Sequence, residues 1–309
     1  MIAPCLRVDT RPRFGVSTPL QVPVLPDFNE SEMEMSTDRK QQPRPVAIVT
    51  GANTGIGAAT ARALHAAGYQ VFGTYRKLPA AKMPGVDYVA CDVTNDLTVD
   101  AAVREVLARA GRIDLLVNNA GVGLIGAAEE SSLDQAKSIF DVNLFGAIRM
   151  TKAVLPLMRQ QRSGRIVNIS SVLGLIPSPF SALYAASKHA MEGYSESLDH
   201  EVRGFGIRVV LVEPAYTRTG FDSNALVADQ KNDHYGPARA NAEAVLRAVM
   251  TAADPPDVVA EAIVTAATAA TPCLRYTAGR LARRVSLLRR FVPASAFDKS
   301  LRKQLQMPA

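Results

Sequence analysis

Short apolar runs alternate with helix-like segments between residue 45 and about residue 278 of this 309-residue chain. The apolar runs have the length of buried strands, and we expect strands at 46–50, 71–75, 86–90, 113–121, 165–171 and 207–214. Helices are expected between them, at 56–67, 98–110, 134–161 and 182–203. Such alternation forms βαβ units, so the sequence predicts an α/β fold with a doubly wound parallel sheet. No change in composition divides the segment 45–278, which indicates a single domain.

Residues 1–44 have a different composition. They contain six prolines and no regular apolar period, which is typical of a disordered extension. A native start at Met35 is one hypothesis, and a transit peptide is another. Four acids argue against an acid-poor transit peptide, namely Asp27, Glu30, Glu32 and Glu34. The first residues also lack the apolar stretch of a secretory signal.

The cysteine and histidine content limits the kinds of site to expect. The three cysteines, Cys5, Cys91 and Cys273, are widely spaced and form no C-x-x-C pair. We therefore expect neither a disulfide scaffold nor a cysteine-based zinc site, and a reducing compartment such as the cytoplasm fits better. The four histidines show no metal-ligand spacing, so no metal site is expected. No apolar run reaches the roughly 18 residues that span a bilayer.

The positive charge is concentrated near the C-terminus. Residues 271–309 hold nine Lys or Arg and one acid, so they carry +8 and leave −2 for the rest of a chain whose net charge is +6. We interpret 279–309 as a basic helical tail, in which apolar residues recur at helical spacing at Leu281, Val285, Leu288 and Val292. The tail either binds a membrane surface or a partner, or packs its apolar stripe on the domain. We favour packing, because terminal helices commonly dock. The near-neutral body and the lack of a recognised binding motif argue against a nucleic-acid partner.

A glycine-rich turn, TGANTGIG at 50–57, joins the first predicted strand to the first predicted helix. Glycines permit a tight turn and let backbone amides approach a pyrophosphate, and the helix N-terminus adds free N–H donors. The spacing is G-x-x-x-G-x-G rather than the usual G-x-G-x-x-G. A simple tight connection is the alternative, but the position after the first strand of a Rossmann-type sheet favours dinucleotide binding.

The second predicted strand ends in Tyr75-Arg76-Lys77, where NAD-binding proteins usually carry an acid that holds the adenine ribose. No acid is present here. A guanidinium pairs well with a phosphate, so Arg76, with Lys77 beside it, predicts a preference for NADP(H). The alternative is an ordinary surface arginine.

Tyr184 and Lys188 are four residues apart in a predicted helix, which places the phenol and the ammonium on one face. An ammonium about 4 Å from a phenolate stabilises it by about 4 kcal/mol at a surface-like dielectric. Such a tyrosine suits proton exchange with a carbonyl or alcohol oxygen, and Ser171 ends the preceding strand. Taken alone, the pair is more typical of an amphipathic helix with a solvated lysine.

Together these segments resemble the classical short-chain dehydrogenase/reductase family, over residues 45 to about 278. Five motifs occur in the family's order: TGANTGIG (50–57), Asn118-Asn119-Ala120-Gly121, Asn143 in DVNLFG, Ser171, and Tyr184-x-x-x-Lys188. The segments KHAMEG (188–193) and RYTAG (275–279) are similar to those of hydroxysteroid and retinol dehydrogenase-like members.

The resemblance implies an oxidoreductase that transfers a hydride between NADP(H) and a carbonyl or alcohol. It implies that Tyr184 is the general acid/base and that Lys188 favours the ionised phenol and binds the nicotinamide ribose. Ser171 would position the substrate oxygen, and Asn143 would hold a water in a proton relay. The cofactor-binding residues expected from the resemblance and from Arg76 are Gly51, Asn53, Thr54, Gly55, Ile56, Gly57, Arg76, Asp92, Val93, Asn119, Tyr184, Lys188, Pro214, Thr217 and Thr219.

Two positions depart from the family pattern. Ala215 follows Pro214 at a position where the family usually has glycine. An alanine restricts the backbone there more than a glycine does. Asn53 stands where many NADP-preferring members carry a basic residue. The predicted NADP(H) preference therefore rests on Arg76.

The apolar segment 172–181 and the segment after residue 215 are expected to form the substrate wall. In the first segment the apolar residues are Leu173, Leu175, Ile176 and Phe180. This lining suits a hydrophobic ketone, aldehyde or secondary alcohol. The helices at 134–161 and 182–203 resemble those that pair subunits in the family, so we expect a homodimer or homotetramer.

A different class of function stays open, namely an NADP(H)-binding sensor or scaffold without turnover, since a fold does not determine a function. The complete set of Asn143, Ser171, Tyr184 and Lys188 argues against it.

Overall fold

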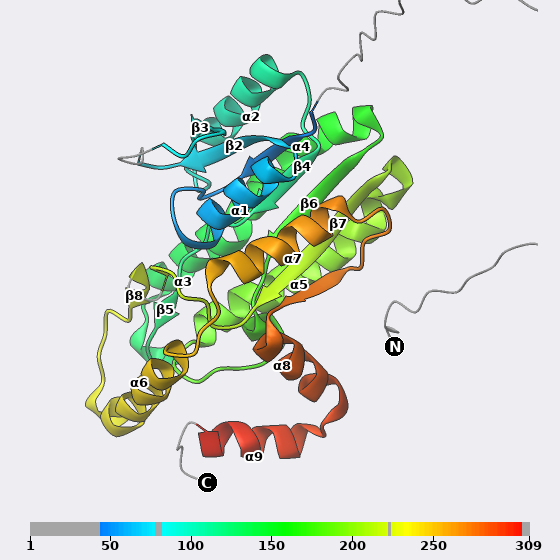
Figure 1. The fold of residues 1–309 in the computed structure, drawn as a ribbon. Coiled ribbons are helices and arrows are strands. Elements are labelled where there is room, and N and C mark those ends of the chain that lie inside the picture. The colour runs from blue at the N-terminus through cyan, green and yellow to red at the C-terminus, as the bar shows by residue number, and fades with distance from the viewer. Residues whose placement is uncertain (1–43, 78–81, 222–223, 305–309) are drawn as a thin grey trace, which may run out of the picture. The chain divides into compact units, whose positions relative to one another are not determined.

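The computed structural model describes residues 44–77, 82–221 and 224–304, and a seven-stranded parallel sheet lies at its centre (Figure 1). The strand order is β3–β2–β1–β4–β6–β7–β9. The strands are β1 (Val46–Val49), β2 (Gln70–Tyr75), β3 (Val86–Ala90), β4 (Leu115–Asn118), β6 (Gly164–Ile169), β7 (Ile207–Pro214) and β9 (Arg275–Ala278). The predicted α/β fold with a doubly wound parallel sheet is confirmed.

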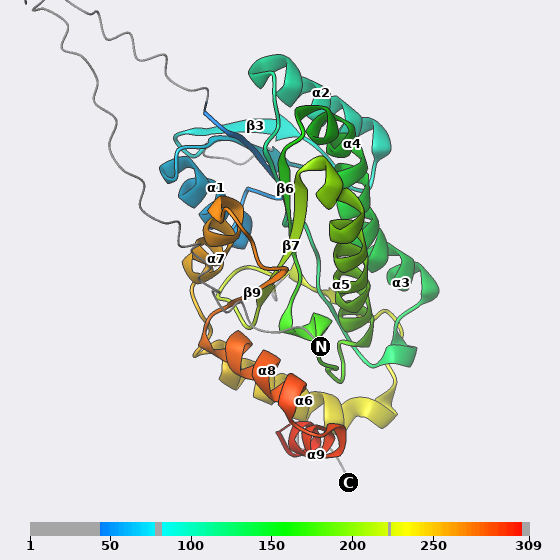
Figure 2. The same ribbon diagram turned by 90° about the vertical axis from the view of Figure 1, so that its right-hand side faces the viewer.

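Helices cover both faces of the sheet (Figure 2). One face carries α1 (Gly55–Ala66) and α7 (Pro256–Thr268), and the other carries α2 (Asp96–Ala110), α4 (Gly146–Gln161) and α5 (Ala182–Val202). Successive side chains of a strand point to opposite faces, so Ile48 enters the core under α2 and α4 while Val49 enters the core under α1 and α7. Both faces are buried, which explains why the strands are almost continuously apolar.

Helix ends follow local sequence signals, as α2 illustrates. The side-chain oxygen of Asn95 accepts hydrogen bonds from the backbone N–H groups of Leu97 and Thr98. At the other end Gly111 adopts a left-handed conformation with φ of 72°, which glycine tolerates best.

Some elements differ from the sequence-based prediction. The strand predicted at 113–121 is only Leu115–Asn118, because the chain leaves the sheet at Asn119 to meet the glycine turn. The helix predicted at 134–161 consists of α3 (Leu133–Phe140), a π-helical turn η2 (Asp141–Phe145) and α4. The sequence does not predict strand β9, whose four residues, Arg-Tyr-Thr-Ala, carry little apolar signal.

Several short elements lie beyond the carboxyl edge of the sheet. They are the parallel pair β5 (Leu124–Ile125) and β8 (Leu226–Val227), the single turn η3 (Val172–Gly174), and α6 (Gly236–Met250). The buried carboxylate of Glu130 accepts hydrogen bonds from the backbone N–H groups of Ala127 and Asn232 and pairs with Arg239 of α6. This ion pair ties α6 to the segment after β5.

The last two described helices are α8 (Arg280–Phe291) and α9 (Ala294–Gln304), which lie at the same end of the molecule as α6 in both views (Figures 1 and 2). In α8, Ala282 is buried and Val285 is half-buried, but Leu281 and Leu288 are exposed. The predicted packing of the whole apolar stripe on the domain is therefore only partly right. Within the described part of the chain, no helix combines the length and hydropathy needed to cross a bilayer.

The predicted N-terminal extension lies outside the described residues apart from Arg44. The guanidinium of Arg44 donates hydrogen bonds to the carbonyl oxygens of Gly68 and Tyr69, at 3.1 and 2.7 Å.

Candidate active site

The carboxyl ends of six strands surround one pocket of about 740 Å³. The strand order reverses between β1 and β4, and open α/β sheets bind ligands at such a reversal. All the residues predicted to bind the cofactor line this pocket, and Ser171, Tyr184 and Lys188 line it too. Asn143 does not line it but is buried behind it. The fold thus brings residues from position 51 to position 219 into one site.

The glycine turn is held in place by the segment after β4. The side-chain amide of Asn119 donates to the carbonyl oxygens of Thr50 and Gly51, and the Thr50 hydroxyl accepts from the backbone N–H groups of Asn119 and Ala120. A Cβ atom on Gly57 would lie 2.2 Å from the carbonyl oxygen of Gly51, so only glycine fits there. Gly51 itself has a φ of 65°. The glycines therefore allow the tight backbone path of the turn, all of whose residues from Gly51 to Gly57 except Ala52 line the pocket.

The end of the pocket near β2 and β3 combines an exposed cation with an ordered carboxylate. Arg76 and Lys77 are exposed, and Asn53 donates a 2.8 Å hydrogen bond to the carbonyl of Lys77. Burial works to raise the pKa of Asp92, but hydrogen bonds from the backbone and hydroxyl of Thr94 and the charge of Arg76 lower it overall. Arg76 and Asp92 both line this end of the pocket.

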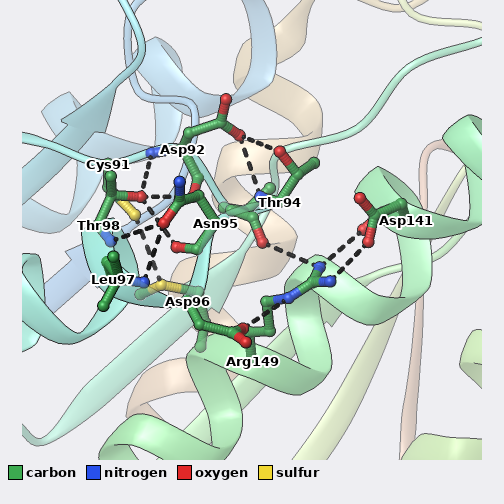
Figure 3. Close-up of polar contacts among 11 residues, drawn as sticks. Cys91, Asp92, Thr94, Asn95, Asp96, Leu97, Thr98, Asp141 and Arg149 are labelled. Atoms are coloured by element: carbon green, nitrogen blue, oxygen red, sulfur yellow. Dashed lines mark hydrogen bonds and ion pairs between the residues drawn. The ribbon is translucent and has the colours of Figure 1, made fainter.

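Arg149 fixes the loop that carries Asp92 (Figure 3). Its guanidinium pairs with Asp96 at 2.8 Å and with Asp141 at 2.7 Å, and it donates to the carbonyl oxygen of Val93 at 3.3 Å. Because Asp141 is the first residue of the π-helical turn, these contacts connect the Asp92 loop to the segment that holds Asn143.

Tyr184 and Lys188 enter the pocket from the first two turns of α5. The Lys188 ammonium lies 5.7 Å from the centre of the Tyr184 ring and donates a 2.9 Å hydrogen bond to the carbonyl of Ile169 at the end of β6. Burial lowers the pKa of Lys188 to about 8, and the nearby charge of Glu192 partly opposes that shift. The site thus holds a buried ammonium beside a phenol.

Ser171 follows β6 and caps the short turn η3. Its hydroxyl oxygen accepts a 3.1 Å hydrogen bond from the backbone N–H of Leu173. This contact uses the hydroxyl as an acceptor, so its own proton can be donated to an oxygen in the pocket.

Asn143 lies in the π-helical turn, a feature that often occurs at functional sites. Its amide nitrogen donates to the Val122 carbonyl and the Ser187 hydroxyl, and its oxygen accepts from the Val122 backbone N–H. A Cβ atom on Gly121 would lie 3.2 Å from the Asn143 oxygen and 3.9 Å from the Lys188 nitrogen. Asn143 therefore joins the loop after β4 to α5, next to Lys188.

A buried charge cluster behind Lys188 was not predicted from the sequence. Arg275 of β9 lies 2.9 Å from Glu192, 3.2 Å from Glu196 and 3.3 Å from Glu213. Burial, aided by the charge of Glu192 and opposed by Arg275, raises the pKa of Glu213 to about 8. Burial also raises the pKa of Glu192. Arg275 is thus the shared cation of three carboxyl groups, of which those of Glu192 and Glu213 are buried.

The substrate side of the pocket is only partly as predicted. Leu173 and Phe180 line it, whereas Leu175 and Ile176 do not. The opposite wall comes from the segment after residue 215, including Phe221, whose ring packs 5.8 Å from that of Tyr184. Helix α6 adds lining residues that the sequence does not reveal, namely Arg239, Ala242, Glu243, Val245 and Leu246. The position of α6 over the pocket follows from long-range packing, so no local signal could have identified it.

The residues present fit a nicotinamide dinucleotide. The turn at 51–57 opens the N-terminus of α1 with backbone amides, which suits a pyrophosphate, and Gly57 lets the turn pack closely on the Gly51 carbonyl and the Asn119 amide. Arg76 and Asp92 lie at one end of the pocket, and Tyr184 and Lys188 lie at the other strand ends. This order along the strand ends matches the adenine, pyrophosphate and nicotinamide parts of such a cofactor.

Comparison with known proteins agrees with this arrangement. Residues 45–230 match the family model described as short chain dehydrogenase. A curated relative, 3-ketodihydrosphingosine reductase of Bacteroides thetaiotaomicron, is 42% identical over 184 residues, which are 60% of this chain and 68% of that protein.

Solved structures show the same similarity. A short-chain dehydrogenase from Streptomyces avermitilis has a TM-score of 0.70 and 34% identity, over 86% of this chain and 96% of that chain. A metagenomic short-chain oxidoreductase in complex with NADP has a TM-score of 0.58 and 29% identity, over 75% of this chain and 95% of that chain. The fold and the site define a nicotinamide-dependent oxidoreductase. The chain belongs to the short-chain dehydrogenase family.

Proposed function

We propose that this protein uses NADP(H) to interconvert a hydrophobic ketone or aldehyde and the corresponding alcohol, with Tyr184 as the general acid/base. The observation that carries the proposal is the buried Lys188 ammonium, which hydrogen bonds to the Ile169 carbonyl and lies 5.7 Å from the Tyr184 ring in the pocket that also contains the glycine turn. The bound nicotinamide supplies or accepts the hydride.

The side chains of this site handle the proton and the substrate oxygen. In the reductive direction, the Tyr184 hydroxyl donates its proton to the substrate oxygen, and the Lys188 charge favours the phenolate that remains. The Ser171 hydroxyl, held through its oxygen by the Leu173 backbone N–H, donates a hydrogen bond to the same substrate oxygen. Asn143 keeps the loop after β4 against α5, beside Lys188, where the family resemblance places a relay water.

The position of Arg76 supports NADP(H) over NAD(H). Arg76 is exposed at the end of β2 and lines the pocket, where its guanidinium suits a 2′-phosphate on the adenine ribose. Among the similar solved structures, one contains NADP and another contains NADH.

The substrate class follows from the lining. The pocket lining includes the apolar side chains of Leu173, Phe180 and Phe221 and of Val245 and Leu246 of α6, and the Phe221 ring lies 5.8 Å from that of Tyr184. The relative from Bacteroides thetaiotaomicron is named for a ketone of a long-chain lipid, which suits such a wall. We propose long-chain aliphatic ketones as the substrates.

The test is oxidation of NADPH by the purified protein across a panel of carbonyl compounds, with 3-ketodihydrosphingosine, long-chain ketones, steroid ketones and small polar ketones. Turnover that increases with the length of the alkyl chain supports the proposal. NADPH binding without turnover of any compound would contradict it and indicate the sensor or scaffold function.

We also propose a homodimer or homotetramer assembled through α4 and α5, which form one outer layer of the domain (Figure 2). Size-exclusion chromatography with light scattering measures the molar mass of the protein in solution. The mass of a monomer would contradict this proposal.

A further inference from the structure

Helix α8 turns large apolar side chains toward solvent. It docks through Ala282 and Val285, and Arg289 donates a 3.1 Å hydrogen bond to the carbonyl of Leu175. Four other residues, here called the α8 apolar patch, are well exposed: Leu281 at 39%, Leu287 at 49%, Leu288 at 50% and Phe291 at 71%. Large exposed apolar patches usually mark an interaction surface, because leaving them in water is unfavourable.

The charge around this patch selects the kind of partner. Residues 280–304 contain six arginines, two lysines and one acid, Asp298, so they carry +7. Since the whole chain carries +6, the other residues together carry −1. Pairing two copies through this patch would bring two +7 segments together, which is unfavourable. A membrane surface with anionic lipids offers both kinds of contact. Its acyl chains accommodate the leucines, and its negatively charged headgroups pair with the arginines.

We propose that α8 and α9 bind the surface of membranes that contain anionic lipids, with the α8 apolar patch inserted at the headgroup boundary. The helices are too short and too charged to span a bilayer, so they lie in its surface plane.

The location of the patch gives this binding a geometric consequence. Helix α8 packs against η3, whose Val172 and Leu173 line the pocket. Helix α6, which supplies Val245 and Leu246 to the pocket, lies at the same end of the molecule (Figures 1 and 2). Membrane binding through α8 therefore brings the pocket end of the domain toward the lipid.

Sedimentation of the 309-residue chain with lipid vesicles tests the proposal without any assay of activity. We expect the protein to sediment with vesicles of phosphatidylcholine and phosphatidylserine, to sediment much less with phosphatidylcholine alone, and to be released by added salt. A protein that stays in the supernatant with both kinds of vesicle overturns the proposal.

Two pairs of substitutions separate the apolar and the charged contributions. The double variant Leu287→Gln/Phe291→Gln should lower partition into anionic vesicles about tenfold or more. The double variant Arg283→Gln/Arg284→Gln should lower it about thirtyfold, as expected for two basic residues near an anionic surface. All four residues are exposed, so both variants should fold, which circular dichroism and thermal melting verify.

Matched substitutions elsewhere provide the controls. Leu97 and Leu133 lie outside α8 and α9 and are 78% and 77% exposed. The variant Leu97→Gln/Leu133→Gln should therefore bind vesicles like the wild type. The charge control is Arg104→Gln/Lys152→Gln, at two exposed residues of α2 and α4. Equal losses in test and control variants would contradict the proposal. Self-association that depends on Leu287 and Phe291, without vesicle binding, would identify the patch as a contact between copies and would also overturn it.

Discussion

The Lys188 ammonium donates a 2.9 Å hydrogen bond to the carbonyl oxygen of Ile169, so the first turns of α5 are fastened to the end of β6 by the cation that we propose assists Tyr184. The side chain is buried, and burial lowers its pKa to about 8. Burial therefore opposes the charged form of Lys188 in the folded protein.

This relationship predicts opposite effects on stability and activity for Lys188→Met. The pKa of Lys188 is lower in the folded than in the unfolded protein, so the folded state binds the proton less tightly and is destabilised most below pH 8. The variant should be more stable than the wild type at pH 7, by on the order of 2 kcal/mol after loss of the hydrogen bond. This advantage should shrink as the pH rises from about 8 to 10.5. Urea unfolding at several pH values measures it.

The same variant should lose turnover by about a hundredfold or more, since the phenolate of Tyr184 loses its stabilising charge. A Lys188→Met protein that is less stable than the wild type at pH 7 would show that the ammonium is well solvated or paired.

Glu213 gives a second pH-dependent prediction. Its pKa is raised from 4.5 to about 8 in the folded protein, so its contribution to stability is fully present below pH 4.5 and is lost as the pH rises through 8. Glu213→Gln removes this titration while Arg275 keeps Glu192 and Glu196 as partners. Relative to the wild type, the variant should gain stability steadily between pH 5 and pH 8. A difference in melting temperature that does not change over this range would contradict the assignment.

Cofactor preference should depend on Arg76. If Arg76 pairs with a 2′-phosphate, Arg76→Ala should weaken NADPH binding about ten- to a hundredfold and leave NADH binding nearly unchanged. Isothermal titration calorimetry measures both affinities, and Arg104→Ala on the exposed side of α2 is the control for a general change in charge. Equal loss of both cofactors would remove the basis for the NADP(H) preference.

The glycine turn offers a steric test with an internal control. A Cβ atom at Gly57 would lie 2.2 Å from the Gly51 carbonyl and 2.6 Å from the Asn119 amide, so Gly57→Ala should cost about 1–3 kcal/mol of stability and weaken cofactor binding. Gly193 of α5 has open space around it, and Gly193→Ala should instead stabilise the protein by about 0.5–1 kcal/mol. Thermal melting that ranks the two variants the other way would refute the described packing of the turn.

Much of the fold and of the pocket lining could be predicted from the sequence, because the pattern is local. Runs such as VAIVT and IRVVLVEP show buried strands, and the carboxyl ends of parallel strands meet at one edge. Gly51 and Thr219 are far apart in the sequence, but each follows the carboxyl end of a strand. The predicted sheet therefore places both in the same pocket.

The features that the sequence does not reveal depend on long-range partners or small changes in helix geometry. The π-helical turn at Asn143 lies inside an uninterrupted helical pattern. Arg275 meets Glu192 from 83 positions away, and Arg239 meets Glu130 from 109 positions away. The periodicity of a segment carries no information about such pairings. It also does not show which face of α8 packs on the domain and which remains exposed.

The most direct test of the catalytic assignment is the rate of NADPH oxidation by Tyr184→Phe, measured beside its NADPH affinity with the best carbonyl substrate of the panel. We expect a loss of turnover of about 10²–10⁴-fold with NADPH affinity nearly unchanged, because only the proton-transferring hydroxyl is removed. Turnover close to that of the wild type would contradict the assignment of Tyr184 as the general acid/base.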